Sequence, residues 1–562
     1  MNTAIKKLLR PELLRSIRES DSLPLLLGLN GRLTGVPVFL VCVVIFATLH
    51  SRTSSAANPV DADLLLVNGT IHIGDGKPAQ VGDVAIVDDR IVAVGKFEVG
   101  TTKQRIDCTG LVVSPGFIDL HNHSDTPATR KETRACVNYL TQGCTTIVTG
   151  NCGSGPVDVA TYYDKLDEHG IGLNIAHLLP QGSLRGRVMQ SERREATVDE
   201  LARMKTLADT AMKDGAWGMS TGLIYVPSSY ADTKELVEIA KVVSEHGGIY
   251  ASHIRGEGNG LLDAVKEALQ IGRDAAIPVH VSHFKSSGKN SWGLVRVAIE
   301  IIRKERAAGR IVTADQYPYI ASSTSLAATF LPPWARAGGT KRMLERLEPG
   351  PDYDRIETAI RKKLDATDQG QRVQIARYRP APAWAGRRLK EIADEKQIEP
   401  FDLLLQTLKN DSGTKIVNFG INEDDVRYVM QQPWVATASD GSAKIPTEDI
   451  PHPRNYGTFP RKIGHYSVRE GVVPLTQAIR SSTGLPADIL GLHDRGYLRV
   501  GMTADIAVWS EKELIDKATF DQPHRYCEGI QYLIVNGTPA IWNGDITGAL
   551  AGQALRHKSG SD

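Results

Sequence analysis

The sequence predicts an α/β protein built on a (β/α)8 TIM-like barrel, with a small β-sandwich domain made from both chain ends and an inserted lid subdomain. Amphipathic helical stretches alternate with short apolar strands at intervals of roughly thirty residues, which is typical of βα units and a parallel sheet. Several apolar runs end in a polar residue, where a barrel strand delivers a side chain to its C-terminal face. A chain of 562 residues also exceeds what one hydrophobic core usually serves.

The central part of the chain carries the barrel pattern. Apolar residues at helical spacing predict helices over 198–213, 234–246, 261–273 and 294–307. The strand candidates are TTIVTG ending at Gly150, GGIYASH at His253, PVHVSH at His283, IVTAD at Asp315 and WVATASD at Asp440. We assign 114–495 to the barrel. Within it, about 331–420 breaks the βα rhythm with Pro and Gly pairs, so we expect an insertion or lid over the barrel mouth.

The two ends of the chain resemble each other and predict the small β domain, 58–113 plus 496–562. Segment 532–538 (YLIVNGT) repeats the pattern of 64–70 (LLLVNGT). Asn68-Gly69 and Gly74-Asp75-Gly76 are the turn chemistry of tight antiparallel hairpins. We therefore expect both ends to meet in one β-sandwich.

Residues 1–57 have the pattern of an export signal or membrane anchor. Basic residues precede an apolar run over 36–49, and small residues follow up to Ala57. The run is shorter than the ~20 residues of a spanning helix, which favours cleavage after Ala57. An uncleaved anchor and an upstream start codon remain alternatives. We expect an exported protein, periplasmic or extracellular and possibly membrane-anchored.

Charge and cysteine content restrict the partners. The formal net charge is +1, so no global field exists to gather nucleic acid, and we expect a small-molecule substrate. Six cysteines are too few for a disulfide scaffold. In an exported protein, however, Cys144 and Cys152 could pair, which is the alternative to any special role for Cys152.

Histidines at strand ends indicate a metal site. His121 and His123 are two apart in FIDLHNH, so one strand can present both imidazoles to the same side. Cys152, His253 and His283 add three candidate ligands, and nitrogen with sulfur donors favours Zn²⁺ over Mg²⁺ or Ca²⁺. Asp440 adds a carboxylate that can touch the metal or its water and carry protons, although an Asp beside a glycine is also a common turn residue.

The order of motifs resembles the N-acyl-D-amino-acid deacylase (D-aminoacylase) family of metal-dependent amidohydrolases. The motifs are SPGFIDLHNHSD, GNCG, STGLIYVPSSYA, SHIRGEG, VSHFKSSG, DQYPY, ASDG and HPRNYGTFPR, and the resemblance runs from about Asp63 to the C-terminus. It implies one or two Zn²⁺ ions. One position would be held by His121, His123 and Asp440, and the tighter one by Cys152, His253 and His283. It also implies that the substrate's carboxylate and carbonyl contact Lys285, Tyr317, Ser323 and Arg454.

One departure from the family pattern lies at Gln181, where relatives usually have a histidine before Gly-Ser-Leu-Arg. Gln181 cannot titrate, but it can still form hydrogen bonds.

The expected reaction is zinc-dependent hydrolysis of N-acyl-D-amino acids, with Asp440 as general base and acid; the preference for the D form comes from the resemblance alone. Four alternatives stay open: a dipeptidase acting on D-amino-acid dipeptides, a hydantoinase-like cyclic amidohydrolase, a Cys-His nucleophilic mechanism, and an inactive relative that serves as an interaction protein.

Overall fold

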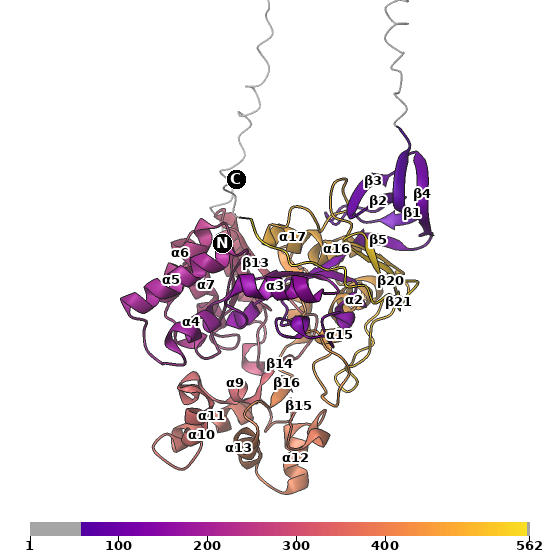
Figure 1. Ribbon diagram of the computed structural model, residues 1–562. Coiled ribbons are helices and arrows are strands. Elements are labelled where there is room, and N and C mark those ends of the chain that lie inside the picture. Colours follow the sequence, from indigo (N-terminus) through magenta and orange to yellow (C-terminus); the bar gives the residue numbers. More distant parts are fainter. Residues whose placement is uncertain (1–57, 559–562) are drawn as a thin grey trace, which may run out of the picture. The chain divides into compact units, whose positions relative to one another are not determined.

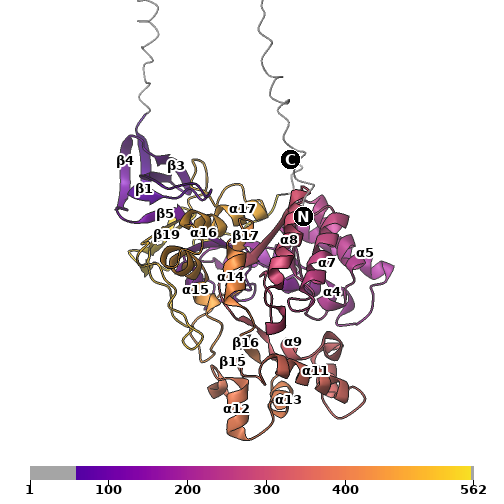
Figure 2. The same cartoon turned by 180° about the vertical axis from the view of Figure 1, so that it is seen from behind.

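The computed structural model describes residues 58–558, which lie within one compact unit that begins at Asn58 (Figures 1 and 2). The expected signal or anchor over 1–57 falls outside the described residues. Between 58 and 558, no helix combines the length and apolar character needed to cross a membrane.

A barrel of parallel strands forms the centre of the fold. One parallel sheet joins β6, β7 and β8, and a second runs in the order β17-β13-β12-β11-β10-β9. The two sheets share the continuous segment 174–180, because β8 pairs with β7 and β9 pairs with β10. A parallel bridge between Asn122 and Gly441 joins the two outer ends. The strands are β6 (Phe117–Asp119), β7 (Cys144–Thr149), β8 (Asn174–His177), β9 (Leu179–Pro180), β10 (Gly218–Gly222), β11 (Ile249–His253), β12 (Val279–Val281), β13 (Val312–Gln316) and β17 (Val435–Thr437).

Helices connect these strands and confirm the alternation predicted from the sequence. Four of them match the predicted ranges to within one residue, because a 3.6-residue apolar period leaves little freedom in placing a helix. These four are α5 (Val198–Lys213), α6 (Thr233–Glu245), α7 (Leu261–Asp274) and α8 (Leu294–Ala307). The other barrel-side helices are α2 (Val137–Leu140), α3 (Val159–His169), α4 (Gln181–Met189), α14 (Glu423–Met430), α15 (Arg454–Pro460), a π-helix (Arg461–Arg469), α16 (Leu475–Ser482) and α17 (Gly484–Leu490).

The chain ends meet in one nine-stranded sheet. Its order is β21-β20-β19-β18-β5-β1-β2-β3, with β4 paired to β1, so the N- and C-terminal strands join where β5 pairs with β18. Leu64 and Leu66 belong to one buried cluster and Leu65 and Val67 to another, as alternation along a strand requires. The strands are β1 (Val60–Ile71), β2 (Gln80–Val87), β3 (Arg90–Gly95), β4 (Val99–Asp107), β5 (Val112–Pro115), β18 (Ile506–Trp509), β19 (Ile530–Val535), β20 (Thr538–Trp542) and β21 (Asp545–Ile546).

The two Asn-Gly pairs of the repeated pattern form different structures, and the predicted hairpin at the first pair is wrong. Asn68-Gly69 lies inside β1, where the register to β2 shifts between Leu66 and Gly69. Asn536-Gly537 instead forms the tight turn between β19 and β20. Both asparagines have positive φ, 60° and 49°. A left-handed Asn suits a bulge as well as a turn, so the dipeptide alone does not distinguish them.

The insertion between β13 and β17 has its own sheet and its own core. β14, β16 and β15 form a three-stranded antiparallel sheet, and Figures 1 and 2 show helices gathered around it. It begins at Ser322, earlier than the predicted 331, because the polar strand Ser-Ser-Thr-Ser carries no apolar signal. The elements are β14 (Ser322–Ser325), α9 (Leu326–Phe330), α10 (Gly339–Arg346), α11 (Tyr353–Ala366), β15 (Val373–Arg377), α12 (Leu389–Lys396), α13 (Pro400–Asn410) and β16 (Lys415–Asn418). The exact domain limits remain a prediction.

We expect Leu404→Ala to destabilise the insertion locally. Leu404 is fully buried in the insertion's own cluster, and removing such a side chain costs about 2–5 kcal/mol. Hydrogen exchange should therefore accelerate between 322 and 418 more than in the barrel strands. Gln406→Ala, at an exposed position of the same helix, is the control. Equal acceleration in barrel and insertion would show that they unfold as one unit.

Candidate metal centre

Asp119 holds the end of β6 to the segment after β17. Its carboxylate accepts hydrogen bonds from the backbone N–H of His121 at 3.2 Å, the Asn122 amide at 2.9 Å and the backbone N–H of Ser439 at 2.9 Å. Burial raises the pKa of Asp119 to about 6. The histidines after β6 and the aspartate after β17 are thereby fixed to the same frame.

Three of the candidate ligands occupy left-handed backbone positions directly after barrel strands. Cys152 has φ 52°, His283 has φ 36° and Asp440 has φ 50°. Non-glycine residues rarely adopt such φ values, and strained residues of this kind cluster at functional sites. The backbone turns at these points and aims each side chain inward.

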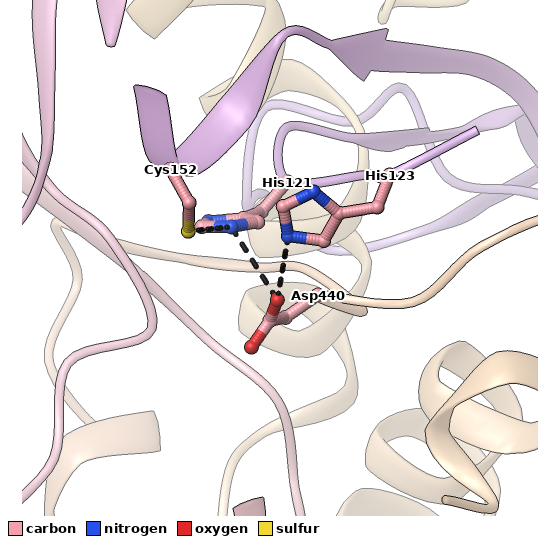
Figure 3. Close-up of side chains that lie close together, drawn as sticks. All are labelled: His121, His123, Cys152 and Asp440. Atoms are coloured by element: carbon pink, nitrogen blue, oxygen red, sulfur yellow. Dashed lines mark hydrogen bonds and ion pairs between the residues drawn. The ribbon is translucent and has the colours of Figure 1, made fainter. Parts of the chain in front are cut away.

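The first group of donor atoms consists of His121, His123, Cys152 and Asp440 (Figure 3). The Cys152 Sγ lies 3.3 Å from His121 Nε2. The Oδ1 of Asp440 lies 3.0 Å from His123 Nε2 and 3.5 Å from His121 Nε2. These atoms all lie within 4.8 Å of one another, close enough to surround one ion.

The second group consists of Cys152, His253 and His283. The sulfur lies 3.5 Å from His253 Nδ1 and 3.6 Å from His283 Nε2, and those two nitrogens are 2.8 Å apart. The Cys152 sulfur therefore belongs to both groups. The structure thus brings together all six side chains that the sequence singled out, in the two sets that the resemblance implied except that Cys152 belongs to both.

The electrostatics of the site suit a cation bound by a thiolate. Burial alone would raise the pKa of the Cys152 thiol, but His121 and His253 beside it hold that pKa well below its ordinary value. Burial likewise opposes the ionisation of Asp440, but Arg454 and His121 hold its pKa well below the ordinary value. Two imidazoles and a thiolate are donors that Zn²⁺ prefers. The donor set therefore fits a zinc ion.

Two acidic residues that the sequence analysis did not assign to the site support the histidines from behind. Asp315 lies with Oδ2 3.4 Å from His121 Nδ1, and its Oδ1 accepts a 2.6 Å hydrogen bond from the backbone N–H of His283. Glu257 Oε1 lies 2.8 Å from His283 Nδ1. Such partners orient metal-binding imidazoles. Their signals were present in the strand-end IVTAD and in SHIRGEG, but neither residue carries a metal-ligand pattern by itself.

A cavity of about 640 Å³ opens beside Cys152 and Asp440. Residues from the barrel loops and from the insertion line it together. Of the four predicted substrate contacts, Ser323 and Arg454 line this cavity, whereas Lys285 and Tyr317 are buried and do not line it. Lys285 Nζ is held by Glu257 at 2.5 Å.

The two open questions about Gln181 and Cys152 have structural answers. Gln181 donates to Glu235 at 3.0 Å and accepts a hydrogen bond from Ser228 at 2.5 Å, so it belongs to a buried polar network. Cys144 and Cys152 are both free thiols, so the alternative disulfide between them does not form.

Comparison with known proteins gives matches over most of the chain. The sequence matches the Amidohydrolase family over 104–305 and 359–541. It is 34% identical to a D-aminoacylase of Alcaligenes xylosoxydans xylosoxydans, over 88% of this chain and 97% of that protein. An N-acyl-D-aspartate deacylase of the same organism is 31% identical, over 89% of this chain and 96% of that protein. The crystal structure of an N-acyl-D-glutamate deacylase from Bordetella bronchiseptica, complexed with zinc and a phosphonate inhibitor, has a TM-score of 0.76 and 29% identity, covering 88% of this chain and 100% of that one.

We expect Cys152→Ala to lower the metal content of the purified protein. The substitution removes the one donor atom common to both groups, so both positions lose a ligand. Elemental analysis after dialysis measures the bound metal. Cys136→Ala, which removes a buried thiol that belongs to neither group, is the matched control. Unchanged metal content in Cys152→Ala would return the cysteine to a purely structural role.

Proposed function

Because the chain belongs to the amidohydrolase family, we propose that it hydrolyses the amide bond of N-acyl-D-amino acids in a zinc-dependent reaction. The products would be a free D-amino acid and a carboxylic acid. The observation that carries this proposal is the position of the Cys152 sulfur, within 3.6 Å of imidazole nitrogens from both donor groups. The D preference rests on the relatives, which include deacylases of N-acyl-D-amino acids.

The six gathered side chains would hold one or two Zn²⁺ ions. His121, His123 and Asp440 would serve one position, and Cys152, His253 and His283 the other. Bound zinc supplies Lewis acidity, which polarises the amide carbonyl and makes water acidic enough to attack near neutral pH. Because that chemistry needs no protein nucleophile, we assign Cys152 the role of a ligand and keep the Cys-His mechanism as the alternative that metal removal tests.

Asp440 is placed to move the proton. Its Oδ1 faces His121 and His123, while its Oδ2 lies 2.7 Å from Arg454 Nη1. We assign it the proton of the attacking water, which it then gives to the departing amine nitrogen. The ion pair with Arg454 keeps the carboxylate ionised and fixes its orientation.

Arg454 and Ser323 are the proposed contacts for the α-carboxylate, since both line the cavity next to Asp440. A guanidinium can bind a carboxylate through two parallel hydrogen bonds. Tyr317 lies behind Arg454, with its ring 4.8 Å from the guanidinium carbon, and its buried hydroxyl has no hydrogen-bond partner within 58–558. We therefore propose that Tyr317 donates to the substrate carbonyl, with Lys285 beside it.

A substrate panel tests the proposal. Metal-loaded protein is assayed for free amine with N-acetyl D- and L-amino acids, a D-dipeptide and a hydantoin. We expect turnover of the N-acetyl-D-amino acids and its loss after chelation. Preference for the dipeptide or for the cyclic amide would favour one of those alternatives. Activity that survives chelation and is lost on thiol alkylation would favour the Cys-His mechanism.

Export is a separate proposal that rests on the basic residues and apolar run within 1–57 alone. Cell fractionation with an antibody against the barrel tests it, and protein found only in the cytosol would contradict it.

We expect Asp440→Asn to lose most turnover while keeping most of the metal. The amide has nearly the same shape but cannot accept and release the proton, and general acid-base catalysis typically contributes about 10²–10⁴-fold. The kcat on the best N-acetyl-D-amino acid and the metal content are measured together. Glu448→Gln, an exposed acid eight residues later, is the control. A near wild-type rate in Asp440→Asn would remove Asp440 from the mechanism.

A further inference from the structure

Three cations line the same cavity as Cys152 and Asp440 and have no role in the proposed reaction. Arg377 on β15 and Lys415 on β16 are cross-strand partners in the insertion's sheet, and Lys444 follows β17. The backbone of Lys444 is fixed to the barrel, because its N–H donates to the Asn138 side chain at 3.2 Å. The cavity thus combines the metal centre with a cationic cluster, which we define as Arg377, Lys415 and Lys444.

The cluster lacks ion-pair partners. Within the described residues, no Asp or Glu oxygen lies within 4.0 Å of the charged nitrogens of Arg377, Lys415 or Lys444. Arg377 donates to the Gly413 carbonyl at 3.0 Å, and its buried Nε has no hydrogen-bond partner. Asp411 lies 3.7 Å from the neighbouring Arg379, and Asp449 also lines the cavity. Three positive charges therefore face the cavity without direct neutralisation.

Elsewhere in the insertion, basic side chains are commonly paired. Arg361 with Glu357, Lys390 with Asp394 and Lys409 with Glu348 lie 2.7–2.9 Å apart. In the cavity, by contrast, like charges act on one another. Burial, followed by Arg377 and Lys444, lowers the pKa of Lys415, and burial lowers that of Lys444, which Asp449 only partly offsets. Unpaired cations that lie close together disfavour one another's protonated forms. An anion bound between them would favour those forms.

The α-carboxylate of the substrate already has its own proposed partner in Arg454, which is paired with Asp440 beside the donor atoms. The cationic cluster lies on strands of the insertion and on the loop beyond β17. A single carboxylate held by Arg454 leaves the cluster without a ligand. The cluster could therefore bind a second negative charge on the molecule that occupies the cavity.

We propose that Arg377, Lys415 and Lys444 bind a second carboxylate of the substrate, so that the preferred substrates are dianionic N-acyl-D-amino acids. This inference rests on the proposed deacylase function. The second carboxylate has two chemical sources, an acidic amino-acid side chain or a dicarboxylic acyl group. Both present the same anion to the same three cations, and matched substrates distinguish them.

Two matched substrate pairs test the proposal. N-acetyl-D-glutamate and N-acetyl-D-glutamine differ mainly in the side-chain charge, and N-succinyl-D-leucine and N-pentanoyl-D-leucine differ mainly in the acyl charge. We expect kcat/KM to favour the charged member of at least one pair by about tenfold or more, the effect of one charge-assisted contact. The pair that shows the preference identifies the source of the carboxylate.

Variants locate the effect. Lys415→Gln and Arg377→Gln should each bring the charged-to-neutral ratio of kcat/KM towards one. Lys362→Gln, which removes an exposed lysine of the insertion outside the cavity, should leave the ratio unchanged. If Arg377→Gln lowers the thermal stability, the result with Lys415→Gln decides, because that side chain is exposed to the cavity.

The possible failures are distinguishable. Hydrolysis of the neutral substrates with a ratio near one in both pairs would overturn this inference and leave the deacylase proposal intact. Equal losses on both members of a pair in Lys415→Gln would indicate general attraction of anions, which also overturns it. Failure to hydrolyse any substrate would overturn the proposed function. In that case, calorimetry with N-acetyl-D-glutamate and N-acetyl-D-glutamine on Asp440→Asn still decides whether the cluster selects the second charge.

Discussion

The shared position of the Cys152 sulfur is the constraint on which the rest of the site depends. A thiolate and four imidazoles lie within a few ångströms of one another in the interior, where unpaired charge is costly. Imidazole nitrogen and thiolate sulfur are both donors to a metal ion, and in each group these atoms lie within 4.8 Å of one another. A divalent cation, as proposed above, would be held by these donors together, and the barrel keeps them in position.

The barrel provides that device through the ends of its strands. The strained backbone at Cys152, His283 and Asp440 is tolerated because buried strands and hydrogen bonds on either side fix it. Asp119 ties the first strand to the last, and Asp315 links His121, after the first strand, to His283, after β12. Both acids are buried, and neither lines the cavity. Their hydrogen bonds attach the donor residues to the stable barrel strands and so fix the positions of the donor atoms. Residues that contact metal ligands commonly have this role.

The sequence was most informative where a local pattern has one structural solution. The helical spacing of apolar residues predicted the bounds of α5 to α8 to within one residue. The position of polar residues at the ends of predicted strands singled out all six donor side chains. It failed where the deciding contact is remote in the chain. β14 is polar and becomes a strand only by pairing with β16, Asn68 forms a bulge because β2 pairs across it, and Glu257 matters only because His283 lies beside it.

The insertion separates two tasks that a barrel alone would combine. Barrel loops carry the donor atoms and Asp440, the carboxylate to which we assign the proton transfer. The sheet β14-β16-β15 rests on its own buried cluster, so its cavity-facing residues can change without disturbing Cys152 or Asp440. The cross-strand neighbours Arg377 and Lys415 then contribute positive charge to the part of the cavity that the insertion lines. Under the two proposals above, selectivity among similar substrates would then depend on a separately stabilised element, while the residues assigned to catalysis stay on the barrel.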